Sequence, residues 1–215
     1  QEEIDRSPIQ FSEGNHSRLR PGDIKYRDLN GDGVIDDYDK MPIGFCDIPE
    51  ITYGFGGAIE WKGFDVSIFF QGTARVSLFE EGSTIVPFSS GYKNNDGFLR
   101  GVMENRWTVD NPDPNARYPR TIRPSDALDN NNTKKSSFWV RNAAFLRLKN
   151  AEIGYTFPKR WMEKMAIQNL RLYVSGVNLL TWAPDVHLFD PDLGSGDGRK
   201  YPPTRVFNVG LNINF

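Results

Sequence analysis

Apolar and polar residues alternate along several stretches of this chain. In "TRVFNVGLNINF", Phe207, Val209 and Leu211 share one side with Ile213 and Phe215, and mostly polar residues occupy the other side. A period of two is typical of a β-strand with one apolar face. Four more stretches repeat this pattern. The sequence therefore predicts five strands, over residues 51–61, 63–75, 143–157, 168–182 and 204–215.

The predicted strands are long, and one of them changes phase. Each has about ten residues or more, which suits a tilted strand that crosses a bilayer, whereas strands of soluble proteins more often have about five or six. In "AAFLRLKNAEIGYTF" the apolar positions shift register near Asn150. A β-bulge at that point would keep both halves facing the same way.

The connections alternate between short and long. Residues 62–63 and 158–167 are short links, while residues 76–140 and 184–203 are long, polar excursions. Outer-membrane barrels have short periplasmic turns and long extracellular loops. The sequence thus predicts an all-β fold of antiparallel transmembrane barrel strands. Residues 1–50 and both long loops are expected outside the cell, and Phe215 in the periplasm.

Five strands do not close a bacterial barrel, and lipid does not tolerate bare strand edges. We therefore expect a larger barrel, whose plug, N-terminal region and signal peptide lie upstream of this chain. No run of 18 apolar residues predicts a membrane-spanning helix. The net charge of −2 argues against nucleic acid as a partner. A single cysteine, Cys46, excludes an internal disulfide and is expected to be a packed thiol.

Aromatic residues gather at the ends of the predicted strands, as in the interfacial belts of membrane proteins. The periplasmic ends carry Trp61, Phe64, Tyr155, Phe157, Trp161 and Phe215, and the outer ends carry Phe70 and Trp182. Packing in a soluble core is the alternative. Polar residues expected to face the plug or water inside the barrel are Glu60, Asp65, Gln71, Arg147, Lys149 and Glu152.

The stretch "DLNGDGVIDDYD", residues 28–39, fits a calcium-binding loop at nearly every position. The expected ligands are Asp28, Asn30, Asp32, the Val34 carbonyl, Asp36 and Asp39. Oxygen ligands on a flexible loop suit calcium, although Asp39 is shorter than the usual glutamate. The flanks carry Pro and Gly instead of framing helices. We expect a structural Ca²⁺ that fixes an exposed loop, with a solvated acidic turn without an ion as the alternative.

The long loops hold weaker candidates. Tyr92, Trp107 and Tyr118 lie among Asn and Asp and could contact a glycan or a lid protein, or else pack the loop on itself. "RGVMENRWTVDNP" predicts a short surface helix that ends near Asp110. The acidic residues between Asp185 and Asp197 are irregularly spaced, which favours a solvated loop over a second metal site.

The chain contains, in this order, the segments "PGDIKYRDLNGDGVIDDYDK", "PEITYGFGGAIEWKGFDVSIFFQG", "FWVRNAAFLRLKNAEIGYTFP" and "NVGLNINF". The chain thereby resembles the C-terminal part of SusC/RagA-type TonB-dependent outer-membrane transporters of Bacteroidetes. The resemblance implies a plugged barrel of about 22 strands. It further implies a SusD-like lipoprotein lid, and import of an oligosaccharide or peptide driven by the TonB complex. A terminal Phe215 resembles the signal that barrel-assembly machinery reads.

No catalytic motif is present, so an enzyme is not expected. The leading hypothesis is a nutrient importer. The alternative is a secreted all-β carbohydrate-binding module with a calcium-fixed loop, and a passive porin is a weaker third. The two leading hypotheses differ in the surroundings of the apolar faces, which are lipid in a barrel and a protein core in a module.

Overall fold

The computed structural model describes residues 1–82, 84–86, 99–121, 131–161 and 167–215, and the chain divides into two compact units. The sheet unit comprises Phe45–Ser77, Asn142–Gly194 and Lys200–Phe215. The loop unit comprises Gln1–Gly44, Leu78–Arg141 and Ser195–Arg199.

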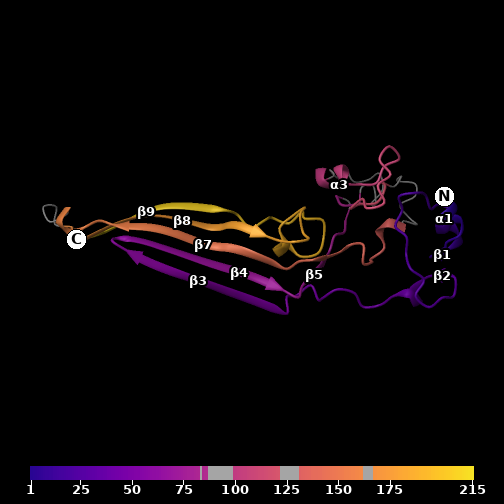
Figure 1. Cartoon of the computed structure of the whole chain (residues 1–215), viewed down its shortest axis with the longest axis horizontal. Helices are drawn as coiled ribbons and strands as arrows, with labels where there is room; N and C mark the ends of the chain where they lie inside the picture. The colour runs from indigo at the N-terminus through magenta and orange to yellow at the C-terminus, as the bar shows by residue number, and fades with distance from the viewer. Residues whose placement is uncertain (83, 87–98, 122–130, 162–166) are drawn as a thin grey trace. The chain divides into compact units, whose positions relative to one another are not determined.

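The sheet unit is built on one five-stranded antiparallel sheet (Figure 1). Its strands are β3 (Ile51–Trp61), β4 (Phe64–Ala74), β7 (Phe145–Thr156), β8 (Asn169–Trp182) and β9 (Val206–Asn214), and they pair in this order. All five predicted strands are present, within two residues of their expected bounds. With 9 to 14 residues each, they have the length of strands that cross a bilayer.

Short and long connections separate to opposite ends of this sheet. β3 and β4 are joined by Lys62 and Gly63, which both have positive φ, of 50° and 91°. Two such residues form the type I′ turn that matches the twist of a hairpin. The link from β7 to β8 contains a short 3₁₀ helix, η4 (Lys159–Trp161), after Pro158. Both links lie at the same end of the sheet, and the long connections leave from the other end (Figure 1).

The predicted β-bulge is confirmed and falls at Lys149. On the β4 side, Phe69 pairs with Asn150 and Phe70 pairs with Leu148, so Lys149 has no partner in the register. The register with β8 shifts at the same place, where Asn178 has a φ of 53°. The bulge keeps the apolar residues on both sides of it on one face of the sheet.

The loop unit consists of short elements around a small apolar core that includes Leu19, Leu78, Val102 and Trp139, with polar contacts between its segments. The elements are α1 (Glu2–Asp5), β1 (Ile9–Gln10), α2 (Glu13–His16), β2 (Val34–Ile35), η1 (Asp37–Asp39), α3 (Arg100–Glu104) and η3 (Asn131–Thr133). β1 and β2 pair in parallel. β5 (Ser77–Phe79) pairs with β6 (Val140–Asn142). The sheet unit also contains the short helix η6 (Pro191–Leu193).

Two expectations are wrong. The helix expected to continue to near Asp110 ends at Glu104, because Arg106 and Trp107 instead adopt an extended conformation beside Tyr118. Cys46 is exposed instead of packed, and its thiol lies 3.4 Å from an Asp47 carboxylate oxygen. Among the described residues, no helix has both the length and the apolar character needed to span a membrane.

Candidate functional site

The sheet has one face without charged side chains. Register pairing places Phe70, Ile68, Val66 and Phe64 of β4 beside apolar residues of β3 and β7, and the series continues through β8 to β9. Most of these large side chains are exposed, and Val209 reaches 76%. Within the described residues, no second layer covers this face.

Charged residues collect on the opposite face. Arg171 of β8 forms ion pairs with Asp65 of β4 and with Glu152 of β7, and its contact with Glu152 is 2.6 Å. Gly154 lies beneath this cluster, where a Cβ atom would come within 2.6 Å of Asp65 and still closer to Arg171. The glycine thus leaves room for an ion pair that crosses β7. Asp65 and Glu152, expected to face the plug or water, are bound by an arginine of the same sheet.

Aromatic rings meet at the ends of the strands, as the sequence predicts. At the end with short links, the ring centroids of Phe64 and Tyr155 are 4.5 Å apart, those of Tyr155 and Phe157 are 5.0 Å apart, and Trp161 follows at 5.9 Å from Phe157. Toward the other end, Phe70 contacts Phe55 and lies 6.4 Å from Trp182. Phe215 is 79% exposed, and its role as an assembly signal stays a prediction.

The acidic loop folds around its own backbone. Asp28 accepts hydrogen bonds from the N–H groups of Gly31 (2.6 Å) and Gly33 (2.9 Å). Asp39 accepts from Leu29 (2.7 Å) and from Asp36 (2.9 Å), and these bonds, led by that from Asp36, lower the pKa of Asp39. The loop is thereby a series of turns in which Asp28, Asp32, Asp36 and Asp39 accept hydrogen bonds from nearby backbone N–H groups.

This arrangement is not yet a coordination sphere. Among the described residues, no three His, Cys, Asp or Glu side chains form a group that could hold a metal ion as they stand. The donor set still fits calcium, since Asn30 and the Val34 carbonyl add neutral oxygens and each bonded carboxylate oxygen retains a second lone pair. Coordination would require small rotations of the Asp28, Asp32 and Asp39 carboxylates.

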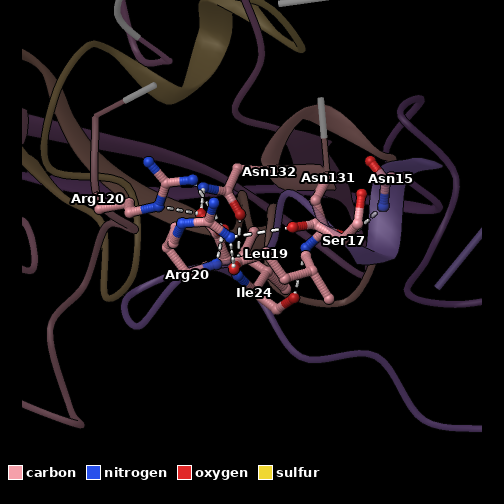
Figure 2. A network of polar contacts seen from close by, with 9 residues as sticks. Asn15, Ser17, Leu19, Arg20, Ile24, Arg120, Asn131 and Asn132 are labelled. Atoms are coloured by element: carbon pink, nitrogen blue, oxygen red, sulfur yellow. Dashed lines mark hydrogen bonds and ion pairs between the residues drawn. The ribbon is translucent and has the colours of Figure 1, made fainter. Parts of the chain in front are cut away.

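Two neighbouring asparagines hold the loop unit together (Figure 2). Asn132 Oδ1 accepts from the Ile24 N–H at 2.8 Å, and Asn131 Nδ2 donates to the Ile24 carbonyl at 2.6 Å. Asn132 Nδ2 also donates to Asp23, which binds Arg120 in an ion pair at 2.6 Å. Three segments far apart in sequence meet here. The buried N–H and carbonyl of Ile24 are therefore hydrogen-bonded to asparagine side chains instead of to a neighbouring strand.

The aromatic candidates of the long loop have different surroundings. Trp107 is half-buried against Gly22 and lines a hollow of about 200 Å³ with Asp113 and Phe138. Tyr118 is 1% exposed, so it packs the loop on itself and does not offer a surface for a glycan or a lid. Burial raises the pKa of the Tyr118 hydroxyl. Tyr92 lies outside the described residues.

The acidic segment after β8 contains contacts that sequence reasoning missed. Asp190 and Asp192, expected in a solvated loop, both bind Arg147 of β7, and Asp185 accepts from the Asn142 N–H at 2.9 Å. Asp185 and Asp190 are thus partly buried and bonded, whereas Asp192 is exposed although it is paired with Arg147. The acidic run after β8 and an arginine expected on the polar face of the sheet were the available signals, but partners 43 residues apart cannot be matched from sequence alone.

Solved structures share this fold. The structure of the RagAB peptide transporter matches with a TM-score of 0.58 and 23% sequence identity, over 80% of this chain and 18% of that chain. The RagAB peptide importer in its closed-closed state matches with a TM-score of 0.62 and 23% identity, over 87% of this chain and 20% of that one. At this identity, the match establishes the fold of the sheet and its neighbouring loops.

Sequence comparison gives the relationship. TonB-dependent receptor P26 of Formosa agariphila is 31% identical over 229 aligned residues, covering 100% of this chain and 21% of the receptor. TonB-dependent receptor SusC of Bacteroides thetaiotaomicron is 26% identical over 205 residues, covering 91% of this chain and 18% of the receptor. The chain is homologous to TonB-dependent receptors of the SusC/RagA type. No family model matches the chain.

The homology relates the sheet to TonB-dependent receptors of the SusC/RagA type. TonB-dependent receptors are transport proteins and not enzymes, and they reside in the outer membrane of Gram-negative bacteria. The chain spans about a fifth of the length of the SusC/RagA-type receptors it matches. The five strands therefore correspond to a part of such a receptor.

Proposed function

We propose that this chain forms neighbouring strands in the wall of an outer-membrane, TonB-dependent importer of a glycan or a peptide. The observation that carries the proposal is the sorting of side chains between the two faces of the sheet. An uncharged, exposed apolar face suits lipid, and a face with paired charges suits a polar lumen. A secreted module would instead bury Val209 and its neighbours in a core.

The free edges of the sheet support a larger barrel. Within the described residues, β3 pairs only with β4, and β9 pairs only with β8. Unpaired backbone groups are too costly to leave in hydrocarbon. We therefore expect both edges to pair with strands beyond this chain, in a barrel of about 22 strands around a plug.

The partners follow from the same proposal. The long connections would lie outside the cell, where a SusD-like lipoprotein could cover the mouth, and the TonB complex would act through regions beyond this chain. The related RagAB structure is that of a peptide transporter, which keeps peptide beside glycan as a substrate class. Trp107 is the described aromatic residue that remains a candidate for contact with a substrate or a lid.

Cell fractionation of the full-length protein tests the proposal. We expect the protein in the outer-membrane fraction, released by detergent but not by high salt or carbonate. An epitope inserted beside Asp113 should be detected on intact cells, whereas one inserted between Lys62 and Gly63 should require permeabilised cells. Recovery of a soluble protein without detergent would instead support the secreted module.

We further propose that the loop of residues 28–39 binds a structural Ca²⁺. Oxygen donors at the six expected positions support this. Because extracellular calcium is abundant, a site with a Kd of about 10⁻⁴ to 10⁻³ M would still be filled. The expected role of the ion is to fix the conformation of the loop, so the proposal involves no metal-activated water.

Titration of the purified protein with Ca²⁺ in a calorimeter measures the calcium affinity and tests this site. Asp28→Asn combined with Asp32→Asn should abolish binding. Asp37→Asn is the matched control, because Asp37 is outside the six ligand positions and forms an exposed pair with Lys40. Equal calcium affinity in both variants, or no binding in the parent protein, would favour a solvated acidic turn.

A further inference from the structure

Residues 183–194, which follow β8, fold back against the sheet instead of extending away from it. The Asp185 carboxylate accepts a hydrogen bond from the Asn142 N–H at 2.9 Å, and Val186 and Pro191 are buried. Asp190 accepts from the Asp192 N–H at 3.0 Å and thereby caps η6. This segment is therefore a docked structure with several points of attachment.

Arg147 is the central point of attachment. It is 1% exposed, and its Nε donates to Thr181 Oγ1 at 2.9 Å. One terminal nitrogen contacts both carboxylate oxygens of Asp190, at 2.6 and 2.8 Å, and the other lies 2.7 Å from Asp192. A buried guanidinium is tolerated only when its charge is paired and its N–H groups are bonded. Arg147 meets this condition only while the segment is docked.

The register of the sheet shows on which side the segment lies. Arg147 pairs with Gln71 of β4 and with Thr181 of β8, both on the polar face. The neighbouring residues Leu146 and Leu148 belong to the apolar face. Because Asp190 and Asp192 reach Arg147, this part of the segment lies on the polar side of the sheet, near the end where the long connections leave.

We propose that residues 183–194 fold into the mouth of the barrel and form part of the wall of the transport path, with Arg147 as the residue that positions them. This inference rests on the proposed barrel, in which the polar face lines the lumen. The segment narrows the entrance and exposes His187 and Asp192, so it limits the size of what enters and offers these side chains to it.

Size-dependent labelling in the full-length protein tests this inference. A cysteine at position 187 (H187C) is introduced in a Cys46→Ser background, and intact cells are treated with a small membrane-impermeant maleimide or with a bulky polyethylene-glycol maleimide. The background protein without H187C corrects for other thiols. We expect the small reagent to react and the bulky reagent to be excluded, because the segment lies inside the mouth.

Releasing the segment should admit the bulky reagent. We expect two variants to raise the rate of labelling by the bulky reagent at least about tenfold: Arg147→Gln, and the double variant Asp190→Asn with Asp192→Asn. The reason is that a docked segment is open only about 0.1–10% of the time. Arg171→Gln, on the same face near the other end, is the matched control and should change nothing. If Arg147→Gln fails to assemble, the double asparagine variant, which retains the arginine, still gives the result.

Two outcomes overturn the inference. One is rapid bulky labelling of H187C in the parent protein, and the other is labelling that Arg147→Gln and the double variant leave unchanged. Either result would leave detergent-dependent extraction from the outer membrane intact. A protein that is soluble without detergent would instead contradict the proposed barrel itself, so the two failures are distinguishable.

Discussion

Replacing Asn132 by alanine tests whether the asparagine pair holds the loop unit together. Asn132 is 1% exposed, and its side chain makes two hydrogen bonds of 2.8 Å, one from the Ile24 N–H and one to Asp23. The substitution leaves the Ile24 N–H buried without an acceptor, which costs about 1–3 kcal/mol. Asp23 keeps its ion pair with Arg120 and its hydrogen bond from the Arg20 N–H, so loss of the bond from Asn132 adds only about 1 kcal/mol.

The expected cost of Asn132→Ala is thus about 2–4 kcal/mol of local stability. Since about 1.4 kcal/mol corresponds to a factor of ten, amide exchange at Ile24 should accelerate roughly 30- to 700-fold. Hydrogen exchange with mass spectrometry on the purified protein measures this directly. The Arg120 amide, which donates to the Gly22 carbonyl at 2.9 Å, should also lose protection if the whole contact opens.

Asn115→Ala is the matched control, because Asn115 is exposed in the same long connection. It should leave exchange at Ile24 within a few-fold of the parent protein. If Asn132→Ala behaves like this control, the polar contacts in Figure 2 do not fasten the segments, and apolar burial around Leu19 and Ile24 must do so instead. Faster exchange at Ile24 alone, without Arg120, would mean that one bond is lost while the segments stay docked.

Three further changes have defined outcomes. Val209→Arg places a charge on the apolar face, which costs up to about 2–4 kcal/mol near the bilayer midplane. It should lower the fraction of assembled protein that resists heat on a gel. The control Asn208→Arg, on the polar face, should not. Gly22→Ala should destabilise the loop unit and raise its cleavage by protease, because Gly22 has a φ of 91° and a Cβ atom would come within 2.3 Å of the Trp107 ring. The pKa of Asp39 is lowered in the folded loop, so its contribution to stability is present above its unfolded value and is lost as pH falls through the folded one. Amide exchange at Leu29, whose N–H donates to Asp39, should therefore lose protection near pH 3 relative to pH 6 after correction for the intrinsic pH dependence of exchange, and equal protection at both would contradict this.

The strands could be predicted because their two faces meet different surroundings. Alternation in β9, or the phase change around Lys149, is a local signal that survives in a single sequence. The turn at Lys62 and Gly63 is local as well. These features need no knowledge of which residues lie opposite one another.

The loop unit could not be predicted in this way because its contacts are distant and not periodic. Asn132 and Ile24 are 108 residues apart, and a run of asparagines is typical of a solvated loop. Tyr118 was a binding candidate because polar residues surround it in sequence, yet it is buried and its ring lies 6.4 Å from that of Trp139. Composition indicates that such a segment is a connection, but does not show which of its side chains become the core.

The distribution of charge along the five strands argues most directly against a soluble module. Arg147, Glu152 and Arg171 lie on one face with Glu60 and Asp65. Of the charged strand residues that have a partner in the register, none lies on the apolar face, and Lys149 in the bulge has no such partner. A soluble sheet of this size would need a second layer over its apolar face, whose cover would come from elsewhere in the same domain. In a membrane, lipid takes the place of that layer. On the polar face, Arg171 is paired with two carboxylates, those of Asp65 and Glu152. This pairing leaves the charge of Arg171 compensated within the sheet.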